Sequence, residues 1–202
     1  CLGEVVNKLA ASELQELGVL SNCHVNVVQM EESVEYSNYQ SELTYLTSDK
    51  DRMKYISGLI ENIRKSGNTL VLVDRIKAGN LLLENIPDAE FVSGEMKTTD
   101  RKDAYTEINE GTNHVVVATY GVAAVGINIP RIFNLVLLEP GKSFVRVIQS
   151  IGRGVRKAQD KDHVEIWDIT STAKFSKRHL RERKTFYKEA NYPFTIEKVK
   201  YK

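Results

Sequence analysis

The segment from Ser143 to Lys157 places most of its polar side chains on one side of a predicted helix. At about 100° of rotation per residue, four of them share a stripe roughly 80° wide, namely Arg146, Gln149, Arg153 and Arg156. Gly152 and Gly154 interrupt the segment although each costs about 1 kcal/mol relative to Ala inside a helix, which favours close approach by a ligand or a backbone. Because guanidinium groups bind phosphate oxygens in pairs and stay charged, the stripe indicates an anion-binding helix. A solvated basic helix face is the alternative.

A second polar group stands where a predicted buried strand ends. The apolar run His114–Thr119 predicts a strand whose last residue carries a hydroxyl, and a short helix of small residues follows it before Pro130. A threonine hydroxyl beside unpaired backbone N–H groups is suited to holding a phosphate. An ordinary strand-to-helix connection is the alternative interpretation.

Both segments resemble known helicase motifs. The pattern Gln149-x-x-Gly152-Arg153-x-x-Arg156 resembles motif VI of superfamily 2 helicases, and Ala118–Pro130 resembles their motif V. Motif VI lies on the second RecA-like domain and points two arginines at ATP phosphates held by the first domain. Arginine fingers of this kind are worth roughly 10³–10⁵ in rate.

The resemblance implies a role for each matching residue. Gln149, Arg153 and Arg156 would be catalytic, and the two arginines would also bind ATP together with Gly126 and Asn128. Many members of the family have Asp where this chain has Asn128, and an amide can still bond a hydroxyl group. The residues implied to contact the nucleic-acid backbone through motif V are Thr119, Tyr120 and Gly121.

Two shorter patterns precede these motifs in the family's order. Asp74-Arg75 after the run Thr69–Val73 resembles motif IV, with Arg75 as a phosphate contact, and Val92-Ser93-Gly94-Glu95 resembles a turn that touches nucleic acid at Gly94. The resemblance covers residues 50–170. From Gln149 to Ala190 the chain is similar to phage recombination helicases that unwind and branch-migrate DNA junctions, and only this similarity favours DNA over RNA.

Strand and helix patterns alternate around these motifs. Apolar runs predict strands at Thr69–Val73, Glu90–Val92, His114–Thr119, Phe133–Leu138 and Val164–Ile169, and helical spacing predicts helices at Asp51–Lys65, Ile76–Ile86 and Thr99–Asn109. Fully apolar strands alternating with helices are typical of an α/β fold with an open parallel sheet covered on both faces. The resemblance makes this a RecA-like domain. Such sheets bind ligands beyond the carboxyl ends of their strands.

We expect three parts in the chain. Residues 1–38 would be a lead-in from a preceding motor domain, with a helix at Ala11–Leu17, a strand at Val25–Val28 and a polar linker. Residues 39–172 would form the RecA-like helicase C-terminal domain, and residues 173–202 a basic helix with a tail. The tail after Pro193 alternates apolar and polar residues and could add an edge strand.

The basic end of the chain suggests a polyanion partner. Residues 173–202 contain ten Lys or Arg and three Glu, a net charge of +7, whereas the whole chain carries +1. The cations are concentrated on the predicted helix Ala173–Ala190, where Lys177, Arg178 and Arg181 are candidate DNA contacts. A solvated basic helix is the alternative.

The first half of an ATPase site is missing from the sequence. There is no G-x-x-x-x-G-K-[ST] phosphate loop and no acidic motif for a metal and the attacking water. We expect an N-terminal RecA-like domain, encoded before Cys1, to hold most of the ATP and Mg²⁺, and the 202 residues alone to be inactive. No Cys/His cluster suggests a metal site.

Two other classes of protein are alternatives to an ATP-dependent DNA helicase. A non-catalytic nucleic-acid-binding module with a degenerate helicase fold is the main alternative. A dinucleotide-binding Rossmann domain does not fit, because Gly152-x-Gly154 lies late in a helix and lacks the third glycine. No run of eighteen apolar residues could span a membrane. We therefore expect a cytoplasmic protein, in the host cytoplasm if a phage encodes it, that acts on branched DNA or duplex/single-strand junctions.

Overall fold

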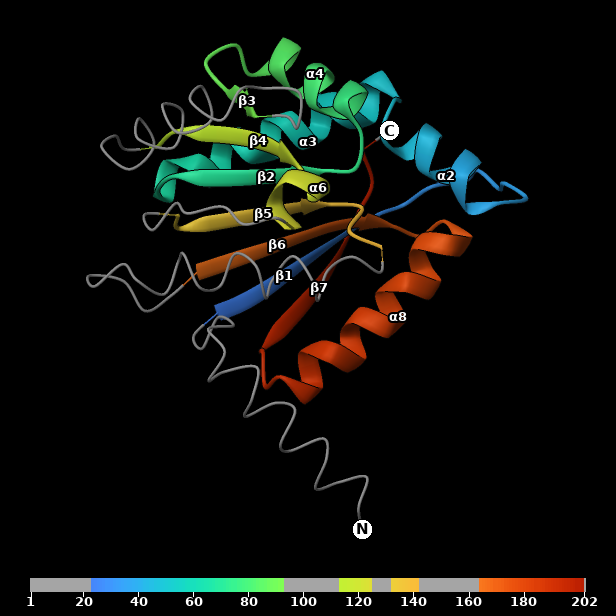
Figure 1. Ribbon diagram of the computed structural model, residues 1–202. Helices are drawn as coiled ribbons and strands as arrows, with labels where there is room; N and C mark the ends of the chain where they lie inside the picture. Colours follow the sequence, from blue (N-terminus) through green and yellow to red (C-terminus); the bar gives the residue numbers. More distant parts are fainter. Residues whose placement is uncertain (1–22, 93–112, 125–131, 142–163, 202) are drawn as a thin grey trace.

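The computed structural model describes residues 23–92, 113–124, 132–141 and 164–201. Their strands form one parallel sheet in the order β3-β4-β2-β5-β6-β1-β7 (Figure 1). The strands are β1 (Cys23–Met30), β2 (Thr69–Val73), β3 (Glu90–Val92), β4 (Val115–Thr119), β5 (Asn134–Leu138), β6 (Val164–Ser171) and β7 (Phe194–Val199). The helices are α2 (Tyr39–Leu46), α3 (Lys50–Ile63), α4 (Ile76–Asn85), α6 (Tyr120–Ala124) and α8 (Lys174–Glu189), with a 3₁₀ turn η1 (Arg64–Ser66).

Two apolar clusters cover the two faces of the sheet. Successive residues of a strand point to opposite faces, so Leu70 and Leu72 belong to one cluster and Val71 and Val73 to the other. Helices α6 and α8 supply the first cluster, and helices α3 and α4 supply the second (Figure 1). The predicted α/β fold, with a parallel sheet between helices, is confirmed.

Strand β1 lies inside the sheet. It pairs in parallel with β6, with Cys23 opposite Val164, and with β7, with Val25 opposite Phe194. The division at residue 38 therefore does not separate a lead-in from the domain. Residues 23–30 form a strand that pairs with β6 and β7, which come last along the chain. The tail likewise belongs to the sheet, and β7 is the expected edge strand.

Element boundaries agree with the sequence patterns to within two residues for most elements. The helix predicted at Asp51–Lys65 is α3 followed by η1, and Gly67 ends it with a φ of 146°. Helix α2 was not predicted from the sequence. It begins after Asn38, a good capping residue, whose side chain accepts a hydrogen bond from the Ser41 N–H. The predicted helices Ala11–Leu17, Thr99–Asn109 and Ser143–Lys157 lie outside the described residues. None of the described helices is long and apolar enough to cross a membrane.

Candidate functional site

The carboxyl ends of β2 and β4 bring two predicted contacts together. Val73, the last residue of β2, is paired with Thr119, the last residue of β4. Arg75 follows Val73 by two residues and Thr119 begins the turn into α6, so both stand at the same edge of neighbouring strands. This is the edge at which parallel sheets bind ligands.

Thr119, Tyr120 and Gly121 present different groups to that edge. The Thr119 Oγ1 accepts a hydrogen bond from the Val122 N–H at 3.3 Å, and the same hydroxyl can still donate to a phosphate oxygen. Gly121 is exposed. Tyr120 is buried and its hydroxyl donates to the Leu138 carbonyl at 2.9 Å; burial raises the pKa of this phenol well above its ordinary value. The phenol therefore faces the core, which leaves only backbone atoms of Tyr120 for a ligand.

Arg75 is held by helix α2. Its guanidinium donates to the Thr44 hydroxyl and, at 2.9 Å, to the Gln40 side-chain carbonyl. The side chain keeps about a third of its surface exposed (35%), so a phosphate can approach it. These two bonds fix the guanidinium close to the edge formed by β2 and β4.

The exposed face of α8 carries the predicted cations. Lys177, Arg178 and Arg181 are all exposed, and with Lys174 they line one wall of a hollow of about 690 Å³. The segment from Glu32 to Glu35 also lines this hollow. The Arg178 guanidinium lies 5.4 Å from the centre of the Phe175 ring, a cation–π distance that orients it. Helix α8 begins just beyond β6, at the same edge of the sheet as Thr119.

Arg183 belongs to the opposite face of α8. Its guanidinium binds the Asp168 carboxylate through both oxygens, at 2.8 and 3.0 Å, and Asp168 has no exposed surface. Tyr187 adds a hydrogen bond to the same carboxylate at 2.6 Å. Although burial favours the neutral form of Arg183, the adjacent Asp168 carboxylate raises its pKa. This arginine therefore fastens α8 to β6 and is not part of the exposed basic surface.

A second buried ion pair fixes the residue that follows β5. The Arg52 guanidinium donates to the Glu139 carboxylate at 2.7 Å and to Glu32 at 3.1 Å, and Arg52 is fully buried. Glu139 also accepts from the Ser176 hydroxyl at 2.9 Å. Burial raises the pKa of Glu139 although Arg52 and Ser176 act in the opposite direction. The network joins α3, α8 and the end of β5.

Glu42 caps the start of α8. Its two carboxylate oxygens accept from the N–H groups of Phe175 and Ser176, each at 2.9 Å. A carboxylate at this position satisfies orphan N–H groups and complements the helix dipole. The cap is supplied by α2, because Ala173 at the N-cap position has no side-chain acceptor. Sequence patterns gave no signal for this cap, since Glu42 and Ser176 are 134 residues apart.

The remaining predicted site residues lie outside the described residues. They are Gly94, Gly126, Asn128, Gln149, Arg153 and Arg156. Their roles at ATP and nucleic acid remain those implied by the motifs. Across the described ranges, no group of three or more His, Cys, Asp or Glu side chains could hold a metal ion.

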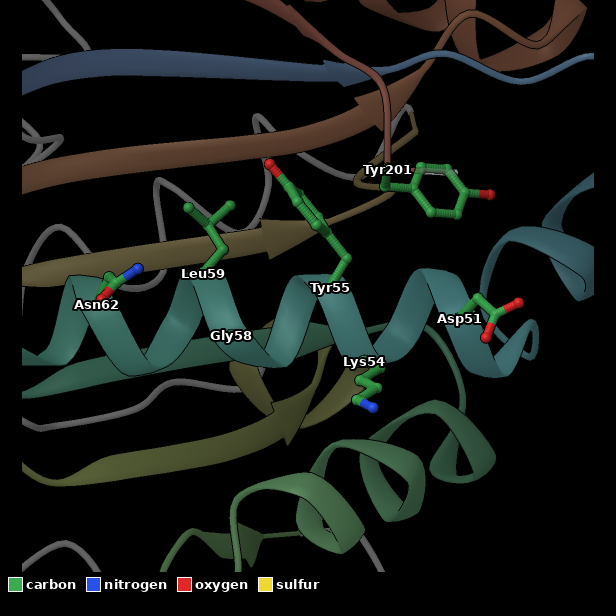
Figure 2. Close-up of a pocket in the computed structure, with 7 residues that line it drawn as sticks. All are labelled: Asp51, Lys54, Tyr55, Gly58, Leu59, Asn62 and Tyr201. Atoms are coloured by element: carbon green, nitrogen blue, oxygen red, sulfur yellow. The ribbon is translucent and has the colours of Figure 1, made fainter.

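A further hollow of about 750 Å³ lies on the outer surface of α3 (Figure 2). It is lined by Asp51, Lys54, Tyr55, Gly58, Leu59, Asn62 and Tyr201. The Tyr55 and Tyr201 rings lie next to each other, with centres 6.2 Å apart. Among the described residues, none of those nominated by the motifs lines this hollow.

Comparison with known families assigns the chain to one family. Residues 51–158, more than half of the chain, match the family described as the helicase conserved C-terminal domain. The chain belongs to this family. It is similar to the ATP-dependent DNA helicase uvsW of Enterobacteria phage T4, with 28% identity over 201 residues. That match covers 94% of this chain and 40% of the phage protein, so the chain spans about two fifths of the relative's length.

Solved structures show the same fold. The crystal structure of T4 UvsW superimposes with a TM-score of 0.77 at 22% identity, over 90% of this chain and 42% of that one. Dbp5 of S. cerevisiae, solved bound to RNA and ADP BeF3, superimposes with a TM-score of 0.58 at 17% identity, over 93% of this chain and 44% of that one. The recognition of a second RecA-like helicase domain, similar to the T4 protein, is confirmed.

Proposed function

We propose that this chain is the second motor domain of an ATP-dependent DNA helicase that unwinds and branch-migrates recombination or replication junctions. One observation carries the proposal most directly. The sheet gathers Arg75, Thr119 and the start of the basic helix α8 at one carboxyl edge, and the chain's family is the helicase conserved C-terminal domain.

The described groups suit the backbone of a nucleic acid. A hydroxyl, backbone N–H groups at a helix start and guanidiniums are the groups that most often bind phosphates. The cations of α8 run from Lys174 to Lys188, which at 1.5 Å per residue spans about 21 Å of helix. We therefore expect sequence-tolerant binding that weakens steeply with salt.

The similar phage T4 protein supports DNA as the nucleic acid and ATP as the nucleotide. The phage T4 protein of which 40% is matched is an ATP-dependent DNA helicase. Arg153 and Arg156 are proposed to reach the phosphates of ATP, and guanidiniums are chemically suited to such anions. The sequence contains no phosphate loop, and we propose that an N-terminal RecA-like domain holds most of the ATP and the metal. Bound ATP would supply the free energy for movement along DNA.

Closing the cleft between the two domains would bring the arginines to the phosphates. In the same movement Thr119 and Arg75 would shift relative to the N-terminal domain's grip on DNA. Hydrolysis would reopen the cleft, which gives stepping along the strand.

The test is Arg156→Ala in the full-length protein. We expect ATP turnover to fall by about 10³-fold or more, as for other arginine fingers, with DNA affinity within about twofold of the wild type because the phosphate contacts are elsewhere. A wild-type protein that binds DNA without hydrolysing ATP would instead support the non-catalytic module.

The isolated 202 residues provide a second test. They contain no phosphate loop, so we expect negligible ATP hydrolysis from them alone. A robust rate that depends on Arg153 in this fragment would contradict the assignment of ATP to another domain.

A further inference from the structure

A basic stripe runs along the exposed side of α8. At about 100° of rotation per residue, five cations and one threonine fall within about 100° of each other, opposite the buried residues Leu180, Arg183 and Tyr187. They are Lys174, Lys177, Arg178, Arg181, Thr185 and Lys188. The first four line the hollow of about 690 Å³ that the segment from Glu32 to Glu35 also lines. This concentration of positive charge indicates a polyanion as the ligand.

The acids near this hollow do little to cancel its charge. Glu32 lines the hollow, but its side chain is only 3% exposed. Its carboxylate accepts from the Arg52 guanidinium at 3.1 Å and from the Tyr201 hydroxyl at 2.6 Å. Glu35 is the exposed acid among the described lining residues. Four cations therefore stand against one exposed carboxylate, which favours the binding of phosphate groups.

The lining of the hollow suits the backbone of a duplex better than a single strand. Proteins that hold single strands stack the bases on aromatic side chains, whereas a duplex stacks its own bases and presents its phosphates. The described residues that line the hollow include no aromatic side chain. The Phe175 ring at the start of α8 is engaged by Lys174 and Arg178, whose charged groups lie 5.5 and 5.4 Å from its centre. The hollow thus offers contacts for phosphates rather than for unstacked bases.

Helix α2 lies between this hollow and the edge that carries Thr119 and Arg75. One side of α2 holds Arg75 through Gln40 and Thr44. Glu42 lies about 160–200° further round the helix and caps α8. In the sheet, β2 and β5 separate β4, which ends at Thr119, from β6, which leads into α8, a distance of about 14 Å at about 4.8 Å per strand. A nucleic-acid strand bound at Arg75 would therefore have to cross α2 to reach the basic stripe.

We infer that the hollow and the basic stripe of α8 form a second DNA site, which binds the duplex arm of a junction while the edge at Arg75 and Thr119 binds the strand along which the protein moves. This inference rests on the proposed function and adds to it the shape of the DNA that is recognised. The four cations of the hollow extend over about 10 Å of helix, which matches about three successive phosphates of one strand of a duplex. Because a single strand reaches only the first site, the second site makes the protein select junctions.

The test measures DNA affinity in the full-length protein at a series of salt concentrations, without nucleotide. The probes are a three-way junction with one single-stranded arm and an oligothymidine. Lys177→Ala combined with Arg181→Ala removes two exposed cations of the hollow and leaves the contacts of Phe175 in place. The matched control is Lys54→Ala combined with Lys65→Ala, which removes two exposed lysines from α3 and η1 on the other face of the sheet.

We expect the α8 double variant to bind the junction about tenfold more weakly than the wild type. The slope of log Kobs against log salt concentration becomes shallower by about 2, since each phosphate contact contributes about 0.9. Its affinity for the oligothymidine stays within about twofold of the wild type, because the first site is unchanged. The control variant leaves both affinities within about twofold. Arg75→Ala weakens both probes alike, by about threefold or more, because both carry the single strand.

Other results overturn the inference. Equal losses of affinity for the junction and the oligothymidine in the α8 variant would place α8 on the path of the single strand. No loss for either probe would leave the stripe to another partner, such as an acidic protein. An equal loss in the control variant would attribute the effect to net charge. The proposed function stands in these three cases. A wild type that neither binds the junction nor hydrolyses ATP in its presence contradicts the proposed function, and the inference falls with it.

Discussion

Asp168 is a fully buried carboxylate whose cation partner, among the residues that the structure describes, is Arg183. Two hydrogen bonds from Arg183 and one from Tyr187 satisfy its oxygens. Removing one member of a buried pair leaves the other charged and without a partner in a medium of low dielectric constant, which costs about 3–5 kcal/mol. Removing one member of an exposed ion pair costs far less, because water solvates the remaining charge.

We therefore expect Asp168→Asn to lower the free energy of unfolding by about 3–5 kcal/mol, measured by urea denaturation. The control is Asp88→Asn, which breaks the exposed pair between Asp88 and Arg64. There Arg64 lowers the pKa of Asp88 through a hydrogen bond, but exposure limits the expected cost to about 0–1 kcal/mol. Equal losses in the two variants would contradict the argument from burial.

The surroundings of single side chains could not be predicted from the sequence. Arg183 sits among the exposed cations of α8 in the sequence but is 4% exposed and bonded to Asp168. Tyr120 follows the motif V threonine, yet its phenol bonds Leu138 inside the core. A sequence gives the type of a side chain and its helical angle. Which side of the element is covered depends on partners far along the chain.

Helices α3 and α4 each contain a glycine in their interior, and the two glycines have opposite surroundings. Nothing lies within 4 Å of a Cβ added to Gly58 of α3, which is exposed. A Cβ added to Gly79 of α4 would overlap the ring of Phe91 on β3. The close approach of α4 to β3 therefore requires a glycine, whereas α3 requires none.

This contrast predicts opposite signs for one substitution. Gly58→Ala is expected to stabilise the protein by about 0.5–1 kcal/mol, since alanine favours the helix and meets no neighbour. Gly79→Ala is expected to destabilise it by about 1–3 kcal/mol, because overpacking outweighs the gain in helix propensity. Thermal unfolding of both variants decides the matter, and two changes of the same sign would contradict it.

At the scale of elements, regular patterns were predictive and short polar ones were not. Helix α3 followed from apolar residues at helical spacing such as Ile56, Ile60 and Ile63, all buried. Helix α2 has eight residues and few apolar positions. Its apolar residues are too few to show a helical period, so the sequence pattern does not distinguish this helix from a loop. Its contribution comes from single contacts, namely the Glu42 cap on α8 and the hold of Gln40 on Arg75.

The whole molecule responds to alkaline pH through weak acids that stay neutral in the folded state because they are partly or fully buried. Burial, reinforced by Glu165, raises the pKa of the Cys23 thiol from 9.0 to about 12. Burial, reinforced by Glu139 and Asp74 among others, raises the pKa of the Tyr39 phenol from 10.0 to about 12. Above the unfolded pKa values, the unfolded chain loses these protons while the folded chain keeps them, so stability falls as pH rises.

We expect the full contribution of both groups below pH about 9 and a progressive loss as the pH rises towards about 12. Urea denaturation at a series of pH values measures it. Tyr39→Phe removes one of these titrating groups and should make the decline above pH about 10 less steep. A free energy of unfolding that stays constant from pH about 8 to about 11 would contradict the prediction.

The sheet itself was largely predictable, but its order was not. Runs such as Thr69–Val73 and Asn134–Leu138 are buried at every position, which identifies them as interior parallel strands from composition alone. The strand near Val25–Val28 was also foreseen, but not its place between β6 and β7. Local pattern carries no information on pairing when Cys23 lies opposite Val164, 141 positions further along the chain.

The position of β1 also sets the order in which the protein can be completed during synthesis. Its apolar residues Val25, Val27 and Val28 need β6 and β7 as neighbours, and β7 ends at Val199. At about 5–20 residues per second, a ribosome adds the intervening residues in roughly ten to thirty seconds. Until β6 (Val164–Ser171) has been synthesised, neither of these two partners is present, and the nascent strand offers a bare edge for aggregation. The earliest described strand to emerge is thus among the last to be paired, and a chaperone that shelters it would raise the yield of folded protein.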